Sequence, residues 1–131
     1  MTTRALSVEE SLRRLTAHET HIGRVAFDDG PGPIVLPVNY RIHAGSVVFR
    51  THGGLLYKAA VDRAPVAFEV DEVNHLWQEG WSVMVRGHLM TEDDPDVCAH
   101  LDTTLRAWDE GVSKSLFVSV RSTAITGREL T

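Results

Sequence analysis

The chain has 131 residues, which predicts a single domain over residues 1–131 with a core that needs no disulfide. Its net charge of −5 argues against a broad nucleic-acid-binding surface. One cysteine, Cys98, excludes an intramolecular disulfide and a cysteine-rich zinc site. No apolar run is long enough to cross a membrane, and residues 1–15 lack a signal-peptide core, so we expect a cytoplasmic protein without a membrane partner.

The first predicted element is a helix that ends near His18. Ser7 and Glu10 have the spacing of a capping box, in which each side chain satisfies a backbone amide of the first turn. Val8, Leu12 and Leu15 follow at helical spacing and give the helix one apolar face.

Short strands follow this helix. Residues 28–33 (DDGPGP) predict a turn, Pro37 predicts an edge or a bulge in its strand, and Ala44-Gly45 predicts a hairpin turn. The expected strands are 22–27, 34–40, 47–51, 66–71, 81–90 and 116–125. In the fourth, Val66, Phe68 and Val70 face one side while Ala67, Glu69 and Asp71 face the other.

Two further helices are expected between these strands. Residues 55–61 can form two turns, and another helix begins at Pro95 with Asp94 as its cap. Six short strands with hairpin-like links predict a mainly β, mostly antiparallel fold. Closure into a barrel removes exposed strand edges, so a barrel is favoured over a sandwich.

One segment predicts a phosphate-binding site. A strand ends in Arg50 and Thr51, a glycine pair follows, and a short helix contains Lys58. Glycines allow a close backbone approach, and the amides of a helix start suit an anion. The spacing of a Walker loop is absent. The alternative interpretation is a strand, a turn and a surface helix with solvated charges.

Three more residues are candidates for contacts with a planar ligand. Asn39 is an amide in an otherwise apolar strand, and it either holds the polar edge of a ring or bonds nearby backbone. Trp81 and Ser82 open another strand, where the tryptophan either stacks on a ligand or fills the core. The seven histidines are scattered without a metal-binding motif, so we expect no metal site.

Taken in order, these segments resemble the pyridoxamine-5′-phosphate-oxidase-like, FMN-binding split barrels. The resemblance runs from Val8 to Leu130. It rests on the order and spacing of six segments: 23–27 (GRVAF), 36–40 (LPVNY), 47–51 (VVFRT), 58–60 (KAA), 66–71 (VAFEVD) and 81–87 (WSVMVRG).

The resemblance implies a six-stranded antiparallel split barrel that forms a homodimer with two flavin sites at the subunit interface. It places one strand beside the isoalloxazine ring, a basic group on the phosphate, and a tryptophan from the partner chain near the site. The positions it assigns to the cofactor are Val38, Asn39, Tyr40, Arg50, Thr51, Lys58, Trp81, Ser82 and Trp108.

Two departures from the family pattern limit the functional prediction. The C-terminal substrate motif of true pyridoxamine phosphate oxidases is missing, which argues against vitamin B6 oxidation. Leu55-Leu56-Tyr57-Lys58 replaces a Ser-Arg-Lys loop, so one basic group is lost. The leading hypothesis is an FMN-dependent oxidoreductase acting on a small molecule, with no catalytic residue identified. The alternatives are a deazaflavin-dependent reductase, a non-enzymatic flavin carrier or sensor, and a dimer without a cofactor.

Overall fold

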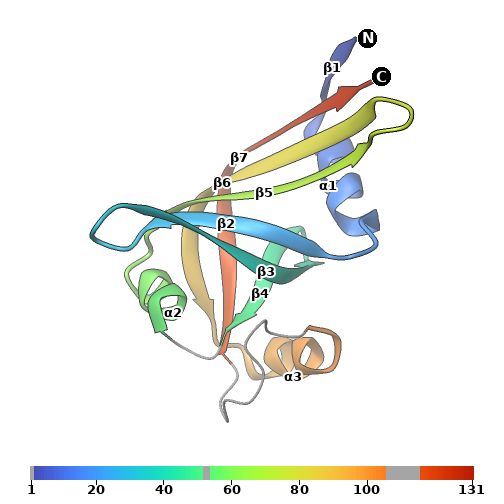
Figure 1. Cartoon of the computed structure of the whole chain (residues 1–131). Helices are drawn as coiled ribbons and strands as arrows, with labels where there is room; N and C mark the ends of the chain where they lie inside the picture. The colour runs from blue at the N-terminus through green and yellow to red at the C-terminus, as the bar shows by residue number, and fades with distance from the viewer. Residues whose placement is uncertain (1, 52–53, 106–115) are drawn as a thin grey trace.

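A computed structural model describes residues 2–51, 54–105 and 116–131. Ten elements follow one another along this part of the chain (Figure 1). They are β1 (Thr3–Leu6), α1 (Val8–Ala17), β2 (Ile22–Asp28), β3 (Pro33–His43), β4 (Ser46–Thr51), α2 (Gly54–Val61), β5 (Pro65–Asn74), β6 (Glu79–Glu92), α3 (Pro95–Thr104) and β7 (Leu116–Leu130).

The strands form an antiparallel sheet that closes on itself. Its order is β1-β7-β4-β3-β2-β5-β6, and an additional pairing of β6 with β7 completes a barrel of six strands. The predicted six-stranded antiparallel split barrel is therefore confirmed. One strand was missed, because β1 is short and pairs only with residues 127–130 of β7, beyond the section of β7 that pairs with β4.

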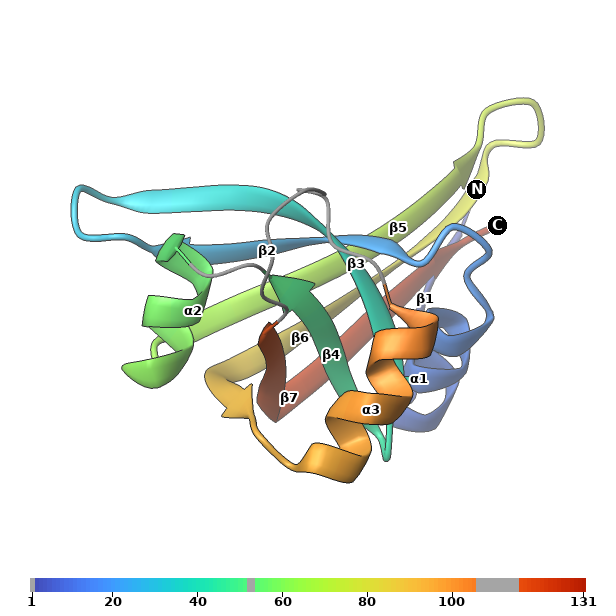
Figure 2. The same cartoon turned by 90° about the horizontal axis from the view of Figure 1, so that it is seen from below.

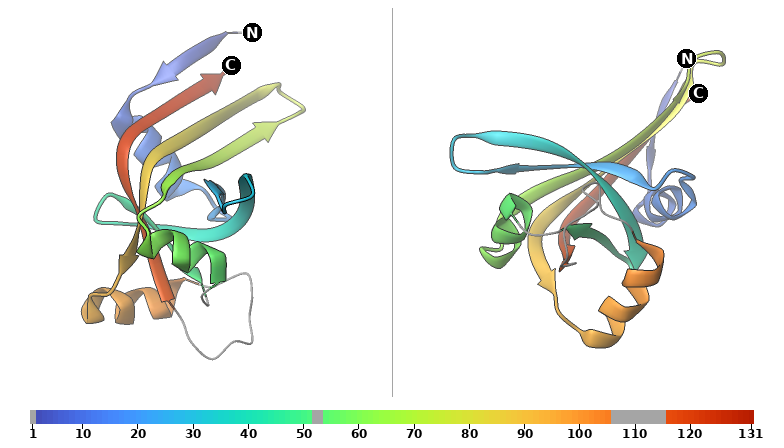
Figure 3. Two further views of the ribbon diagram at one scale, coloured as in Figure 1. Left: turned by 90° about the vertical axis from the view of Figure 1, so that its left-hand side faces the viewer. Right: turned by 60° about the horizontal axis from the view of Figure 1, so that its bottom comes forward.

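Three strands run past the barrel and form an extension at one end. The β5–β6 hairpin and the C-terminal half of β7 project together beside α1 and both chain termini (Figures 1 and 3). The sequence predicted β5 only to Asp71 and β7 only to Ile125, whereas they reach Asn74 and Leu130. Exposed polar residues at these ends hide the strand pattern, and ladder pairing with β6 provides the backbone hydrogen bonds.

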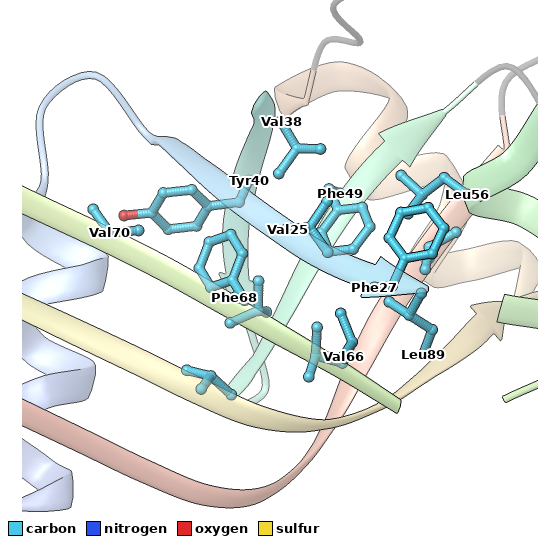
Figure 4. Packing of buried hydrophobic residues seen from close by; sticks show 14 of the residues in the cluster. Val25, Phe27, Val38, Tyr40, Phe49, Leu56, Val66, Phe68, Val70 and Leu89 are labelled. Atoms are coloured by element: carbon cyan, nitrogen blue, oxygen red, sulfur yellow. The ribbon is translucent and has the colours of Figure 1, made fainter. Parts of the chain in front are cut away.

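Aromatic side chains fill the barrel. Tyr40, Phe49 and Phe68 are fully buried, with ring centroids 5.1 Å apart for Tyr40–Phe68 and 6.4 Å for Phe49–Phe68 (Figure 4). The short helix α2 adds Leu56, Ala59 and Ala60 to this core and covers one end of the barrel (Figure 2). Helix α3 instead packs on a second cluster made of Val48, Leu101, Leu105 and Phe117.

The predicted turns and caps are confirmed in detail. Ala44 and Gly45 both have positive φ, at 49° and 79°, as a tight hairpin turn requires. Pro37 lies in a part of β3 that pairs with β2 alone, since β4 joins β3 only from Tyr40 onward. The capping box of Ser7 and Glu10 is formed at the start of α1.

A bulge bends β6 where it crosses β7. The pairing register shifts between Arg86 and Gly87. A Cβ atom at Gly87 would lie 1.9 Å from the carbonyl oxygen of Arg121, so only glycine allows the two strands to approach this closely. Among the described residues, no helix is long and apolar enough to cross a membrane.

A buried hydrogen bond attaches α1 to the barrel. The Tyr40 hydroxyl donates to the carbonyl oxygen of Leu15 at 2.6 Å, and both side chains are fully buried. Burial raises the pKa of the Tyr40 hydroxyl well above its usual range, so it remains a proton donor in this bond.

We predict that Tyr40→Phe lowers the free energy of unfolding by about 1–3 kcal/mol, because the Leu15 carbonyl would be left buried without its donor. The change is measured as a shift of the denaturation midpoint at constant m-value. Tyr57→Phe is the matched control, since the described part of the chain offers the half-buried Tyr57 hydroxyl no hydrogen bond. Equal losses in the two variants would contradict the role of the Tyr40 bond.

Candidate functional site

Side chains that point away from the core form one continuous face across five strands. On it, Arg24 of β2 lies opposite Pro37 of β3 and Glu69 of β5. Farther along, Ser82 of β6 lies between Asp71 and Arg128. Because side chains alternate along a strand, the shared face can be read directly from this register. We call it the open sheet face; its members are Val35, Pro37, Asn39, Ile22, Arg24, Ala26, Ala67, Glu69, Asp71, Ser82, Met84, Arg86, Thr126 and Arg128.

The three helices pack elsewhere on the barrel. Helix α1 lies on the opposite side of the sheet, where Gly127 allows Ser11 to approach and Arg14 lies over the Trp81 ring. Helix α2 covers the barrel end, and α3 packs on Val48 and Phe117. The open sheet face therefore keeps exposed and half-buried side chains of both charge signs.

A cavity of about 320 Å³ lies where this face continues onto the extension. Glu69, Asp71 and Val73 line it from β5, Trp81 and Ser82 from β6, and Arg128 from β7. Ser82 contributes a hydroxyl that can donate or accept a hydrogen bond. Two residues that the sequence assigned to a cofactor, Trp81 and Ser82, are thus brought together at one cavity.

Trp81 is held in place by α1. Its ring meets the His18 ring edge-on with centroids 5.6 Å apart, and the guanidinium carbon of Arg14 lies 6.0 Å from the ring centroid. Arg14 also forms an ion pair with Glu129 at 3.0 Å. These contacts fix the tryptophan between the helix and the sheet, next to the cavity.

A pair of carboxyl groups lies on the cavity wall, and sequence analysis did not select it. Glu69 and Asp71 are two residues apart on β5, so their side chains share a face and interact. Burial, followed by the effect of the neighbouring Asp71 carboxyl, raises the pKa of Glu69 to about 7, while Arg24 opposes the shift. The alternation in 66–71 already placed both on the outer face, but nothing in the sequence showed that they line a cavity.

The predicted phosphate-binding residues lie at the other end of the barrel. Arg50, with 18% of its side chain exposed, donates to the carbonyl oxygen of Leu105 at 2.8 Å and pairs with Asp102 at 2.9 Å. Its guanidinium therefore connects β4 to α3. Thr51 ends β4, directly opposite Leu116 of β7.

Lys58 is exposed on α2 and lines a separate cavity of about 240 Å³. Asp28, Asp29 and Asp62 line the same cavity, so acidic groups outnumber the single lysine there. Within the described part of the chain, one carboxylate oxygen of Asp29 is buried without a hydrogen-bond partner. This cavity can accept a hydrogen-bond donor, and among the described residues that line it, Lys58 provides the one cation, an exposed ammonium.

The structure separates the predicted site residues into two groups. Arg50 pairs with Phe117 and Ser82 with Arg128, so the two positions are eleven residues apart along β7. At about 3.3 Å per residue, the path along the strand is about 35 Å, which exceeds the length of an FMN molecule. One chain alone therefore does not bring Arg50, Thr51 and Lys58 to Trp81 and Ser82.

The remaining predicted residues have different positions. Val38 and Tyr40 point into the barrel core, whereas Asn39 is half-buried on the open sheet face (Figure 4). Trp108 lies outside the described residues.

Neither a metal cluster nor a reactive thiol is found among the described residues. No group of three or more potential ligands gathers there. The Cys98 thiol donates to the carbonyl oxygen of Glu92 at 3.2 Å, and burial with nearby acidic residues raises its pKa, which disfavours the thiolate.

Solved structures of known proteins share this architecture. A solved structure of a candidate pyridoxamine 5′-phosphate oxidase from Corynebacterium glutamicum has a TM-score of 0.80 and 30% identity over 99% of both chains. An FAD-binding protein of Mycobacterium smegmatis has a TM-score of 0.78 and 31% identity, covering 98% of this chain and 100% of that one.

The sequence comparisons agree with the structural ones. The uncharacterized protein Rv0080 of Mycobacterium tuberculosis is 30% identical over 119 residues, which cover 87% of this chain and 77% of the relative. The family model described as pyridoxamine 5′-phosphate oxidase matches residues 7–129. The chain therefore belongs to the pyridoxamine 5′-phosphate oxidase family.

Proposed function

We propose that this protein is a flavin-dependent oxidoreductase whose cofactor, FMN in the first instance, binds at the interface of a homodimer. The observation that carries the proposal is the separation of the candidate residues into two groups at opposite ends of the barrel. In a two-fold dimer, one end of each chain can meet the other end of its partner. Two equivalent sites would then each combine Lys58 of one copy with Ser82 of the other.

The chemistry of the open sheet face suits a flavin ring. The cavity beside Ser82 lies on this face, and Ser82 and Asn39 provide polar groups for the ring edge. A bound flavin supplies hydride or electron transfer, and the protein positions it and tunes its electronic properties. Ser82 and Asn39 would orient the ring, and the partner copy would exclude water from its other face.

The residues expected to bind the flavin phosphate provide few positive charges. Lys58 would pair with the phosphate and Thr51 would offer a hydroxyl donor, while Arg50 also connects β4 to α3 through Leu105 and Asp102. One ammonium surrounded by the carboxylates of Asp28, Asp29 and Asp62 predicts a moderate affinity for a phosphate dianion. This reduced set of cations is the specific reason to keep a deazaflavin coenzyme as the second candidate.

The positions of Tyr40 and Glu69 indicate which of them could exchange a proton with a bound ligand. The Tyr40 hydroxyl is buried and donates to Leu15, so it cannot reach a ligand on the open sheet face. Glu69 lines the cavity and exchanges its proton near neutral pH, as a general acid or base requires. We therefore assign proton transfer at this cavity to the Glu69–Asp71 pair.

Three alternatives to the proposed function can be distinguished by experiment. FAD is the ligand named for the Mycobacterium smegmatis relative, and it shares the ring and first phosphate with FMN. A carrier or sensor would bind a flavin without turnover in the presence of reductants and acceptors. A dimer without a cofactor would bind none of these flavins.

We predict that the purified protein binds FMN and that Lys58→Ala weakens this binding about 10- to 100-fold, because a charge-assisted bond to the phosphate is lost. Titrations with FMN, FAD and the deazaflavin, followed by absorption and thermal shift, measure the affinities. Arg13→Ala is the control for loss of a positive charge, since Arg13 lies on α1 at the other end of the barrel. Unchanged affinity in Lys58→Ala would reject the phosphate assignment, and no binding of any flavin would reject the proposed function.

Light scattering gives an independent test of the dimer. We predict twice the chain mass of 14.5 kDa at micromolar concentration, because the site needs both ends of the barrel. A mass of one chain in the presence of saturating flavin would contradict an interfacial site.

We predict that Glu69→Gln changes the pH dependence of stability. The pKa of Glu69 rises from an ordinary value of 4.5 in the unfolded chain to about 7 in the folded protein. The folded state therefore holds the proton more tightly, and the wild-type protein loses stability as pH rises from about 4.5 to about 7. Denaturation midpoints of both proteins check this: the stability of the variant relative to wild type should increase across this window, and a constant difference would contradict the shift.

A further inference from the structure

A buried oxygen atom without a hydrogen-bond donor belongs to the end of the barrel that carries Lys58. Asp29, in the turn between β2 and β3, lines the cavity of about 240 Å³ together with Lys58. One of its carboxylate oxygens is buried, and no donor in the described part of the chain, Lys58 included, reaches it. A buried acceptor without a partner is unfavourable, so this carboxylate indicates a donor that comes from a ligand.

Backbone hydrogen bonds hold the turn that carries Asp29. The Gly30 amide donates to the Asp28 carboxylate at 2.8 Å, and the Asp29 amide donates to the Gly32 carbonyl oxygen at 3.1 Å. Gly30 has a φ of 109°, a conformation that glycine adopts without steric cost. The turn is therefore fixed without the Asp29 side chain, which leaves its carboxylate available to a ligand.

The cavity lies between this turn and α2, which are side by side at one end of the barrel (Figures 1 and 2). Phe27 is almost fully buried and forms an apolar part of the lining, whereas Lys58 is exposed on α2. Rotation about the last side-chain bond of an aspartate is easy, so either oxygen of Asp29 can meet a donor inside the cavity. A ligand that Lys58 binds in this cavity would therefore also meet the Asp29 carboxylate.

The charges that line the cavity favour a neutral donor beside the phosphate. Asp28 and Asp62 are exposed at the same cavity, so together with Asp29 three carboxylates accompany one ammonium. A second anionic group would be repelled there, whereas a hydroxyl donates to a carboxylate without adding charge. Among the described residues, no three potential metal ligands come together, which argues against a metal ion as the partner of Asp29.

We propose that Asp29 accepts a hydrogen bond from a hydroxyl group of the flavin's ribityl chain, beside the phosphate that Lys58 binds. FMN, FAD and the deazaflavin coenzyme all carry this chain between the ring and the first phosphate. The bond gives the buried carboxylate its missing partner, and it offsets part of the repulsion that the three aspartates exert on the phosphate. The inference rests on the proposed flavin function, and it concerns a cavity within a single copy.

Three flavin probes separate the contributions of the ring, the chain and the phosphate. Lumiflavin has the ring without the chain, riboflavin adds the hydroxyl groups, and FMN adds the phosphate. Dissociation constants are measured by flavin fluorescence for the wild type and for Asp29→Ala. We expect Asp29→Ala to weaken riboflavin and FMN binding about 10-fold each and to leave lumiflavin binding unchanged, because a hydrogen bond to a charged acceptor is lost. Asp29→Asn keeps an acceptor oxygen and should weaken riboflavin binding less.

Asp62→Asn is the matched control for the loss of one negative charge. It removes an exposed carboxylate from the same cavity, so FMN should bind more tightly while riboflavin binding stays unchanged. The two aspartate variants should therefore shift FMN affinity in opposite directions. Unchanged riboflavin binding in Asp29→Ala, or equal weakening of all three probes, overturns this inference alone. A wild-type protein that binds none of the probes overturns the proposed function as well.

Discussion

The pairing of β7 with strands on both of its sides holds this protein together. One side of β7 pairs with β6 along nearly its whole length, and the other side pairs first with β4 and then with β1. Closure of the barrel depends on this strand, because β6 would otherwise be an unpaired edge. The bulge at Gly87 allows β6 to follow β7 around the bend, and the two strands then continue together beyond the barrel.

Closure fixes the positions of the candidate residues. Side chains inside the barrel are committed to the core, which explains why Val38 and Tyr40 cannot present their side chains to a ligand. Their neighbour Asn39 lies on the outside by alternation, on the same face as Ser82 and the Glu69–Asp71 pair. A flavin bound as proposed would therefore meet the outer face, where a second copy could cover it.

The sequence predicted the barrel well because its signals are local. The capping box of α1, the Asp94 cap of α3 and the alternation in β5 each depend on residues close in the chain. The site was predicted less completely because its signals are not local. The sequence predicts Arg50 as a phosphate ligand beside a glycine pair, but it does not indicate the contacts of Arg50 with Asp102 and Leu105, which lie more than fifty residues away. Likewise, the environment of Glu69 depends on pairing between β2, β5 and β6, which no motif encodes.

Under the proposed function, the extension explains why one chain would carry half of each of two sites. The core is filled by residues of the barrel strands, β1, α1 and α2, and the exposed hairpin tip over residues 72–79 adds no buried side chain to it (Figure 4). The extension instead carries Trp81, Ser82 and the carboxyl pair away from the barrel end that carries Lys58. In the dimer proposed above, two copies would bring these groups together without a change in either barrel, so the pairing that closes the fold favours a site shared between copies.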